Sequence, residues 1–169
     1  MRALALLSLA ISLGLASVAP AEDRDSGVGS VTNLPLPRYV SLRSNEINVR
    51  RGPGLDYRKD WVFLRAGLPV RVIDEYGDWR RVVDHDDAGG WVYHAMITGR
   101  RTVLVTADKT FFREEPTETA AALAEAEQGV VARLRRCRQE WCEIEAKGHS
   151  GWVRKTAIWG VDANEVSTD

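Results

Sequence analysis

The sequence predicts an all-β protein that contains two copies of one small unit, and three observations lead to this fold class. The two halves of the chain match at their aromatic anchors, Trp79 with Trp141 and Trp91 with Trp152. Each half is a series of short apolar segments separated by turn residues, which is typical of β-strands. The composition, with 44% hydrophobic and 28% charged residues, is that of a folded soluble protein.

The match between the halves extends over apolar, turn and aromatic positions together. Single-residue gaps shift the offset between the copies from 63 positions at its start to 61 at its end. The matched pairs include Arg50 with Arg113, Pro53 with Pro116, Gly67 with Gly129, Val70 and Val72 with Ala132 and Leu134, and Ile97 with Ile158. Self-similarity of this kind indicates a duplicated structural unit, and 169 residues suffice for two small domains.

The N-terminal segment has the three parts of a secretory signal. Arg2 supplies the positive charge, residues 3–18 form the apolar core, and Ala19-Pro20-Ala21 offers the small residues that a signal peptidase needs. We expect a signal peptide at 1–21 and a linker at 22–38. A retained anchor is the alternative, but the apolar run is shorter than the ~20 residues of a transmembrane helix. The mature protein is therefore expected to be periplasmic or secreted, without a membrane span.

The charge balance argues against a nucleic-acid partner. Removal of residues 1–21 reduces 23 basic residues to 22 and leaves 24 acidic ones, so the formal net charge becomes −2. A nucleic-acid-binding domain would carry a basic excess or a basic stripe. The densest basic segment contains Arg133, Arg135, Arg136 and Arg138, and a solvated strand and turn explains it.

The first unit begins with a predicted hairpin. Apolar segments at 70–72 and 79–82 flank the polar, glycine-containing stretch 74–78, which we expect to be the turn. A second turn at 84–90 leads to a strand at 91–93.

The second unit repeats this order, with strands at 132–134 and 141–144 and a turn at 147–151. Residues 118–128, rich in alanine and glutamate, have helix propensity. Their counterpart at 61–64 has the pattern of a strand, so the repeat predicts a strand, with a helical turn as the alternative.

Each unit would be a barrel of ~60 residues, which is marginally stable alone because it buries only about 60% of its unfolded surface. Trp79 and Trp91 are large enough to fill much of the first barrel. Only residues 98–101 separate the copies, so we expect the barrels to pack against each other with little freedom.

A tight loop is predicted in the segment Asn48-Val49-Arg50-Arg51-Gly52-Pro53-Gly54. Its glycines permit a sharp turn, and the proline fixes its own φ and favours an extended residue before it. This segment resembles the bacterial SH3-like (SH3b) domain, as do the positions that follow it: Gly67, Val70, Val72, Trp79, Gly90-Trp91-Val92 and Ile97, with Trp141, Gly151 and Trp152 in the second copy.

The resemblance covers residues 39–160 and implies two tandem SH3-like small β-barrels packed together, at 39–98 and 99–161. Residues 162–169 are expected to be a disordered tail. The arrangement is similar to that of small exported proteobacterial proteins with tandem SH3 domains. The second copy departs from the motif: its segment 111–116 lacks both glycines, so its loop should have a different shape.

The resemblance also implies a ligand class. SH3-like barrels bind peptides in an aromatic groove, and the bacterial kind is similar to modules that target cell-wall peptides. Tyr57, Tyr76 and Trp79, near the loop and the first hairpin, are the predicted ligand-binding residues, and core packing is the alternative role for them. Because the first copy keeps the glycine-proline loop, we assign binding to residues 39–98.

Cys137 and Cys142 flank the tip of the second predicted hairpin, where a disulfide can join two neighbouring strands. The short loop it closes corresponds to about 2 kcal/mol of stabilisation. Glu75 and Arg80 occupy the matching positions of the first copy. The alternative role is a Cys142 nucleophile paired with His149, in an accessory or weak hydrolase of cell-wall metabolism.

No other pattern predicts catalysis, a cofactor or a metal site. The three histidines lack the spacing of zinc ligands, and the acidic run Asp84-His85-Asp86-Asp87 resembles a calcium loop whose twelfth position is Ala95 instead of glutamate. The sequence thus predicts a non-enzymatic binding or scaffolding module for a cell-wall peptide or an envelope protein, with a purely structural role as a further alternative.

Overall fold

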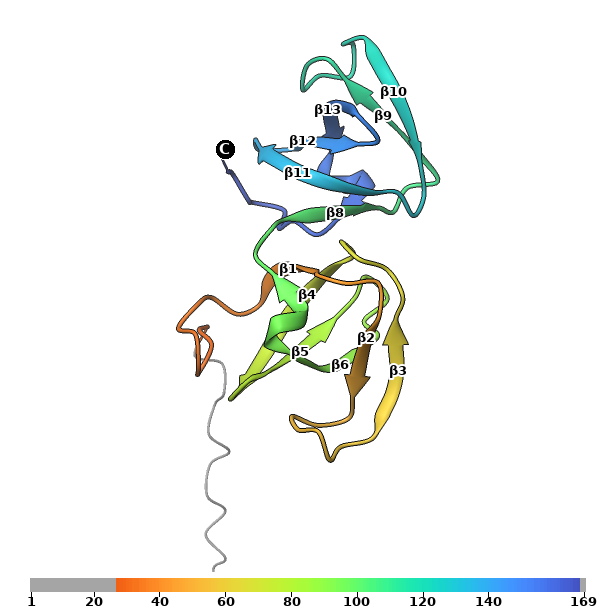
Figure 1. Ribbon diagram of the computed structural model, residues 1–169. Helices are drawn as coiled ribbons and strands as arrows, with labels where there is room; N and C mark the ends of the chain where they lie inside the picture. The colour runs from red at the N-terminus through yellow and green to blue at the C-terminus, as the bar shows by residue number, and fades with distance from the viewer. Residues whose placement is uncertain (1–26, 168–169) are drawn as a thin grey trace, which may run out of the picture.

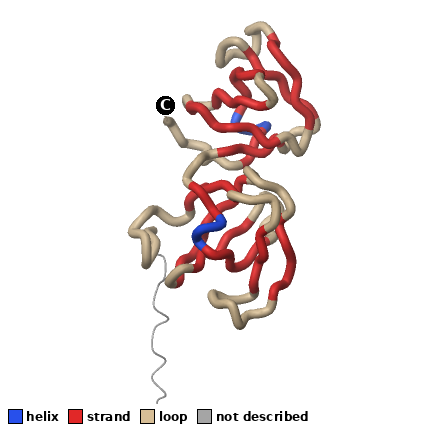
Figure 2. Tube along the Cα trace, viewed as in Figure 1, coloured by secondary structure: helices blue, strands red, loops and turns tan. Residues whose placement is uncertain are grey.

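The computed structural model describes residues 27–167, which form two small barrels of antiparallel strands stacked one on the other (Figure 1). Within these residues the regular elements are strands and two single-turn 3-10 helices (Figure 2). The predicted all-β class and the duplication are therefore confirmed. The predicted signal peptide lies outside the described residues. Within residues 27–167, no helix is long and apolar enough to cross a membrane.

The two sheets have the same topology. The first has the strand order β3-β2-β6-β5-β4-β1-β7 and the second the order β10-β9-β13-β12-β11-β8-β14. The strands of the first are β1 (Arg38–Leu42), β2 (Ile47–Arg50), β3 (Lys59–Phe63), β4 (Pro69–Tyr76), β5 (Trp79–Val83), β6 (Gly89–Tyr93) and β7 (Ile97–Thr98). Those of the second are β8 (Thr102–Val105), β9 (Lys109–Arg113), β10 (Ala122–Glu127), β11 (Val131–Cys137), β12 (Trp141–Ala146), β13 (His149–Arg154) and β14 (Ile158–Trp159). The helical turns η1 (His94–Met96) and η2 (Lys155–Ala157) precede the last strand of each sheet.

Two local predictions can be compared with these bounds. Residues 118–128 contain β10 and no helix, so the repeat predicted this segment better than helix propensity did. The first hairpin turn is shorter than the predicted stretch 74–78, because β4 continues to Tyr76 and pairs it with Trp79. Only Gly77 and Asp78 remain in the turn, and Gly77 takes the positive φ that a tight turn requires.

The core of the first barrel consists mainly of β-branched residues on alternating strand positions, such as Val49, Val70, Val72, Val82 and Val92, all fully buried. Burial of each such side chain contributes about 1.5–3 kcal/mol. The second barrel has an equivalent core of its own. Each domain is thus held together by its own apolar interior.

The tryptophans do not fill the first barrel as expected. Successive side chains of a strand point to opposite faces, and since Val92 points inward, its neighbour Trp91 points outward and is only half-buried. Trp79 is half-buried for the same reason. In the second domain Trp141 and Trp152 occupy the same outward positions but are buried, because other side chains cover them.

Hydrogen bonds join the two barrels across β1 and β8. The Thr102 hydroxyl lies 2.6 Å from the Ser41 hydroxyl and donates to the Gly67 carbonyl at 2.6 Å. The guanidinium of Arg65 donates to the carbonyl of Gly129 at 2.7 Å. These bonds confirm that the barrels pack against each other.

An aromatic and cationic cluster completes the interface between the barrels. The ring of Tyr39 meets that of Trp159 edge to face with centroids 5.1 Å apart. The guanidinium of Arg101 lies over the Tyr39 ring at 5.6 Å and donates to the carbonyl of Gly160 at 2.7 Å. Short connections and close contacts therefore stack the barrels as one packed unit.

The described part of the predicted linker folds back onto the first domain. Residues 27–37 lie beside the β4–β5 hairpin, where the backbone N–H groups of Val31 and Thr32 donate to the carboxylate of Glu75. The Thr32 hydroxyl and the Arg38 guanidinium donate to the same carboxylate at 2.7 and 2.6 Å. This segment is consequently part of the folded domain.

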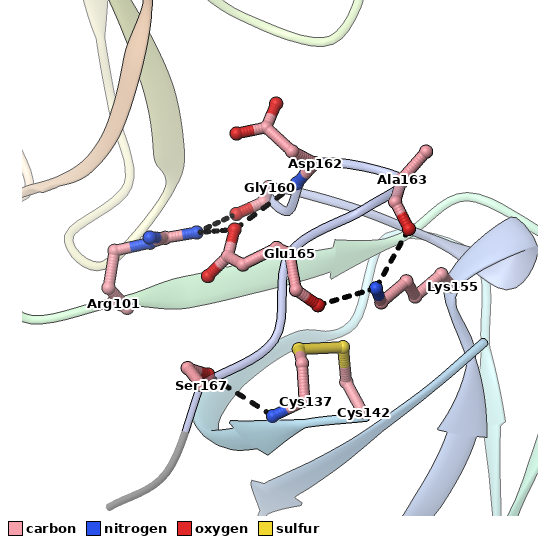
Figure 3. Close-up of a disulfide and its surroundings, with 9 residues drawn as sticks. All are labelled: Arg101, Cys137, Cys142, Lys155, Gly160, Asp162, Ala163, Glu165 and Ser167. Carbon is pink, nitrogen blue, oxygen red and sulfur yellow. Dashed lines mark hydrogen bonds and ion pairs between the residues drawn. A yellow bond between two sulfur atoms is a disulfide. The ribbon is translucent and has the colours of Figure 1, made fainter. Parts of the chain in front are cut away.

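The structure also differs from the predicted disordered tail, since residues 160–167 pack on the second domain (Figure 3). The buried Lys155 ammonium donates to the carbonyls of Ala163 and Glu165 at 2.9 and 2.6 Å. Ser167 and Cys137 exchange two backbone hydrogen bonds, each of 3.1 Å. A buried cation that needs acceptors holds this segment in place, and sequence pattern alone does not reveal such a requirement.

Candidate functional site

The first domain carries a row of aromatic side chains on three neighbouring strands, with a half-buried tryptophan between two exposed tyrosines. Tyr76 of β4 pairs with Trp79 of β5, which pairs in turn with Tyr93 of β6. Residues directly opposite each other across paired strands lie on the same face of a sheet. Tyr76 is 66% exposed and Tyr93 40% exposed, and the ring of Tyr93 meets that of Trp79 edge to face at 5.8 Å.

Tyr57 lies in the loop between β2 and β3, which Arg50 links to Trp79. The ring of Tyr57 lies against Gly52, where an added Cβ would be only 2.4 Å from the ring. Tyr57 itself is 49% exposed. The Arg50 guanidinium donates to the carbonyls of Leu55 and Tyr57 and lies 5.9 Å from the centre of the Trp79 ring. Arg50 therefore connects the loop to the strands.

We call Tyr57, Tyr76, Trp79 and Tyr93 the aromatic surface. The β2–β3 loop and the tip of the β4–β5 hairpin both lie at the end of the first barrel that faces away from the second barrel (Figure 1). The three predicted ligand-binding residues thus occur in one region. Sequence reasoning missed Tyr93, although the strand register, once the hairpins are aligned, places it next to Trp79.

The corresponding surface of the second domain is closed by charged side chains. Arg154, the counterpart of Tyr93, lies over the Trp141 ring at 4.7 Å and pairs with Glu118 and Glu140. The hydrogen bond to Glu118, together with that to Glu140, raises the pKa of Arg154 above its ordinary value. Trp141 is only 7% exposed as a result. The same position therefore holds a half-buried tryptophan beside exposed tyrosines in the first copy and a buried tryptophan under an arginine in the second.

A buried ion pair and a disulfide occupy equivalent places at the ends of the two hairpins. Glu75 is paired with Arg80 across β4 and β5, and Cys137 is bonded to Cys142 across β11 and β12. Burial alone would raise the pKa of Glu75, but the hydrogen bonds from Thr32, with those from Arg38 and a further backbone N–H, lower it to about 2. Glu75 is thus a fixed anion around which the hairpin and the N-terminal segment are organised.

The disulfide bears on the alternative catalytic role of Cys142. Cys142 is completely buried and bonded to Cys137, as predicted, and residues 27–167 contain no free cysteine (Figure 3). The thiolate is the nucleophilic form of cysteine, so the sulfur is not a nucleophile while the bridge is intact. His149 is exposed at the start of β13.

The acidic run of the first domain is used in a turn. Asp84, His85 and Asp86 have side-chain ligand atoms within 4.8 Å of one another. The Asp84 carboxylate, however, accepts hydrogen bonds from the backbone N–H groups of Asp86 and Ala88 at 3.0 Å. These bonds are those of an aspartate that shapes a tight turn.

The motif residues have structural roles in the packing of the strands. Val49 and Gly52 are buried, whereas Asn48 is exposed. Gly90 lies where an added Cβ would be 2.7 Å from the Arg50 carbonyl oxygen, and Gly151 lies equally close to β9 in the second domain. These glycines let β6 and β13 cross closely over β2 and β9.

Comparison with protein families agrees with this architecture. The family model described as bacterial SH3 domain matches residues 43–99 and 106–160. The protein YrvJ of Bacillus subtilis (strain 168), named as an N-acetylmuramoyl-L-alanine amidase, is 24% identical over 139 residues, which cover 76% of this chain and 27% of YrvJ. Two solved structures, NlpC2 and NlpC1 from Trichomonas vaginalis, are 12% identical with a TM-score of 0.34.

The matched regions are only parts of these relatives. The two structural alignments cover 73% and 78% of this chain and 48% of each solved chain. This chain thus spans about a quarter of the curated relative and about half of each solved chain. The family model, in contrast, matches both barrels over most of their length. The chain therefore belongs to the bacterial SH3 domain family, with one copy of the domain in each barrel.

Proposed function

We propose that this protein is a non-catalytic, extracytoplasmic binding module whose first SH3 domain holds cell-wall peptides on the aromatic surface. The observation that carries the proposal is the difference between the copies: exposed Tyr76 and Tyr93 flank the half-buried Trp79 of the first domain, whereas Trp141 of the second is buried under the ion-paired Arg154. Tyrosine and tryptophan dominate the energetics of many binding surfaces because they bury a large area with little loss of conformational freedom.

Other observations support the place and the class of ligand. The disulfide is of the kind that persists in oxidising compartments outside the cytoplasm. The signal peptide predicted at 1–21 would bring the protein there. The amidase name of the matched Bacillus subtilis protein refers to a bond of the cell wall. In the proposed arrangement the second domain braces the first through the hydrogen bonds of Thr102.

The test is retention of the mature protein on purified cell-wall sacculi. We expect the wild type to be retained and Tyr93→Ala to weaken retention about tenfold, equivalent to ~1.4 kcal/mol, because it removes one ring of the row. The matched control is Phe111→Ala, since Phe111 has the same exposure, 39% against 40%, but lies in the second domain. This control should bind like the wild type.

Three outcomes would contradict the proposal. Absence of wild-type retention would exclude the wall as ligand and favour an envelope protein partner. Equal effects of Tyr93→Ala and Phe111→Ala would exclude the aromatic surface as the binding site. Release of soluble wall fragments by the purified protein would contradict the non-catalytic part.

A further inference from the structure

A polar hollow of about 360 Å³ lies beside the aromatic surface, where β2, β5 and β6 cross. Its central residues are Arg50, Trp91 and Arg81, which face one another in the strand register. Gly89 and Gly90 also line it, and because they carry no side chains, the space between the arginines and the indole remains open. The hollow is a consequence of the same close approach of β6 to β2.

The charges around this hollow are unbalanced. Arg50 is engaged with loop carbonyls, whereas Arg51 and Arg58 both pair with Asp60. The hydrogen bond from Arg58, aided by that from Arg51, lowers the pKa of Asp60, which therefore stays ionised. The other lining carboxylate, Asp87, pairs with Arg71. The lining of the hollow thus carries three arginines, Arg50, Arg51 and Arg81, against two aspartates.

Arg81 is the arginine that carries the excess charge. Its side chain is exposed and, although Asp74 of β4 lies opposite it in the strand register, among residues 27–167 it forms no hydrogen bond or ion pair. A guanidinium offers a planar fork of donors that matches the two oxygens of a carboxylate. Beside it, the half-buried indole of Trp91 supplies an apolar wall for the group that carries the carboxylate.

The second domain lacks this arrangement. Glu143 replaces Arg81 and pairs with Arg136 at 2.6 Å. Arg136 and Arg138 both lie over the ring of Trp152, which is buried. Within residues 27–167, the unpaired guanidinium and the half-buried indole therefore occur together in the domain that also has the aromatic surface.

We propose that Arg81 and Trp91 form a subsite for a peptide carboxylate, adjoining the aromatic surface. This inference rests on the proposed function, because it takes the ligand to be a peptide. Arg81 binds the carboxylate through paired N–H···O bonds, Trp91 contacts the residue that bears it, and the rest of the peptide continues over Tyr93 and Trp79.

The experiment compares two probes that differ only in this group, acetyl-D-alanyl-D-alanine and its C-terminal amide, added to the 15N-labelled mature protein. We expect the free acid to shift the indole N–H signal of Trp91 and the Nε–H signal of Arg81, with an affinity about tenfold above that of the amide. Arg81→Gln should abolish the difference between the probes, and Arg81→Lys should retain part of it. Arg133→Gln, which removes another exposed arginine, should have no effect.

The outcomes separate this inference from the proposed function. Equal shifts by acid and amide, or no shift by either, would overturn the carboxylate subsite even if sacculi retain the protein. Equally strong shifts by inorganic phosphate would overturn it as well, since they indicate an unselective anion site. Selective shifts by the acid without retention on sacculi would support the subsite and contradict the wall as ligand. Unchanged signals away from the hollow verify that the Arg81 variants are folded.

Discussion

Replacement of Glu75 by glutamine is expected to lower the free energy of unfolding at pH 7 by about 3–5 kcal/mol, the usual cost of removing one member of a buried ion pair. The side chain of Glu75 is fully buried, and its carboxylate receives hydrogen bonds from Val31, Thr32 and Arg38. Without the charge, Arg80 and Arg38 would remain in a partly buried place without an anion. Urea unfolding, followed by tryptophan fluorescence, measures this loss.

The same residue should govern acid stability. The pKa of Glu75 is about 2 in the folded state, below its ordinary value of 4.5. A lowered pKa means that the stabilisation is complete above pH 4.5 and disappears as the pH falls to about 2. By linkage, the lowered pKa contributes about 3 kcal/mol to the free energy of unfolding. The wild type should lose this contribution between pH 4.5 and about 2, and the Glu75→Gln variant should show no such loss.

The control for both measurements is Asp60→Asn, which removes a carboxylate with two arginine partners at the surface. Exposed pairs of this kind contribute at most about 1 kcal/mol, so this variant should stay close to the wild type at pH 7. If Glu75→Gln were as stable as Asp60→Asn, the buried anion would not organise the hairpin.

The second large effect is expected from Gly90→Ala. The new methyl group would lie 2.7 Å from the Arg50 carbonyl oxygen and 2.8 Å from a methyl carbon of Val49, so β2 and β6 would have to move apart. Overpacking of this kind costs about 1–3 kcal/mol. The midpoint of urea unfolding should fall accordingly.

Gly99→Ala is the matched control, because an added Cβ at Gly99 has no atom within 4 Å and the backbone there is not left-handed. Gly151→Ala should reproduce the effect of Gly90→Ala in the second domain, where the methyl would lie 2.8 Å from the Cβ of Phe112. Equal midpoints of urea unfolding for Gly90→Ala and Gly99→Ala would show that β2 and β6 leave room for a methyl group at position 90.

The fold could be predicted because its signals repeat. Alternation marks the strands, and the two copies correct each other, as when β3 showed that the alanine-rich β10 is a strand. The disulfide could be predicted because only two cysteines exist and a hairpin separates them. Such features depend on neighbours in sequence or on an internal copy.

Other features depend on contacts that no local pattern contains. The burial of Glu75 requires Thr32, which lies 43 positions earlier. Whether an outward tryptophan is open or covered depends on a third strand, which supplies Tyr93 above Trp79 and Arg154 above Trp141. For this reason the sequence indicated the first copy through its glycine-proline loop, but not that an arginine covers the tryptophan of the second copy.

The most direct test of peptide binding by the first domain uses the indole N–H signals of the tryptophans as reporters. The ligand is a soluble muropeptide mixture prepared from digested sacculi. The six tryptophans lie in both domains. If the open copy binds, the signal of Trp79 will shift on titration and the signal of Trp141, its covered counterpart, will not. A shift of the Trp141 signal with an unchanged Trp79 signal, or no shift of either signal, would contradict binding by the first domain.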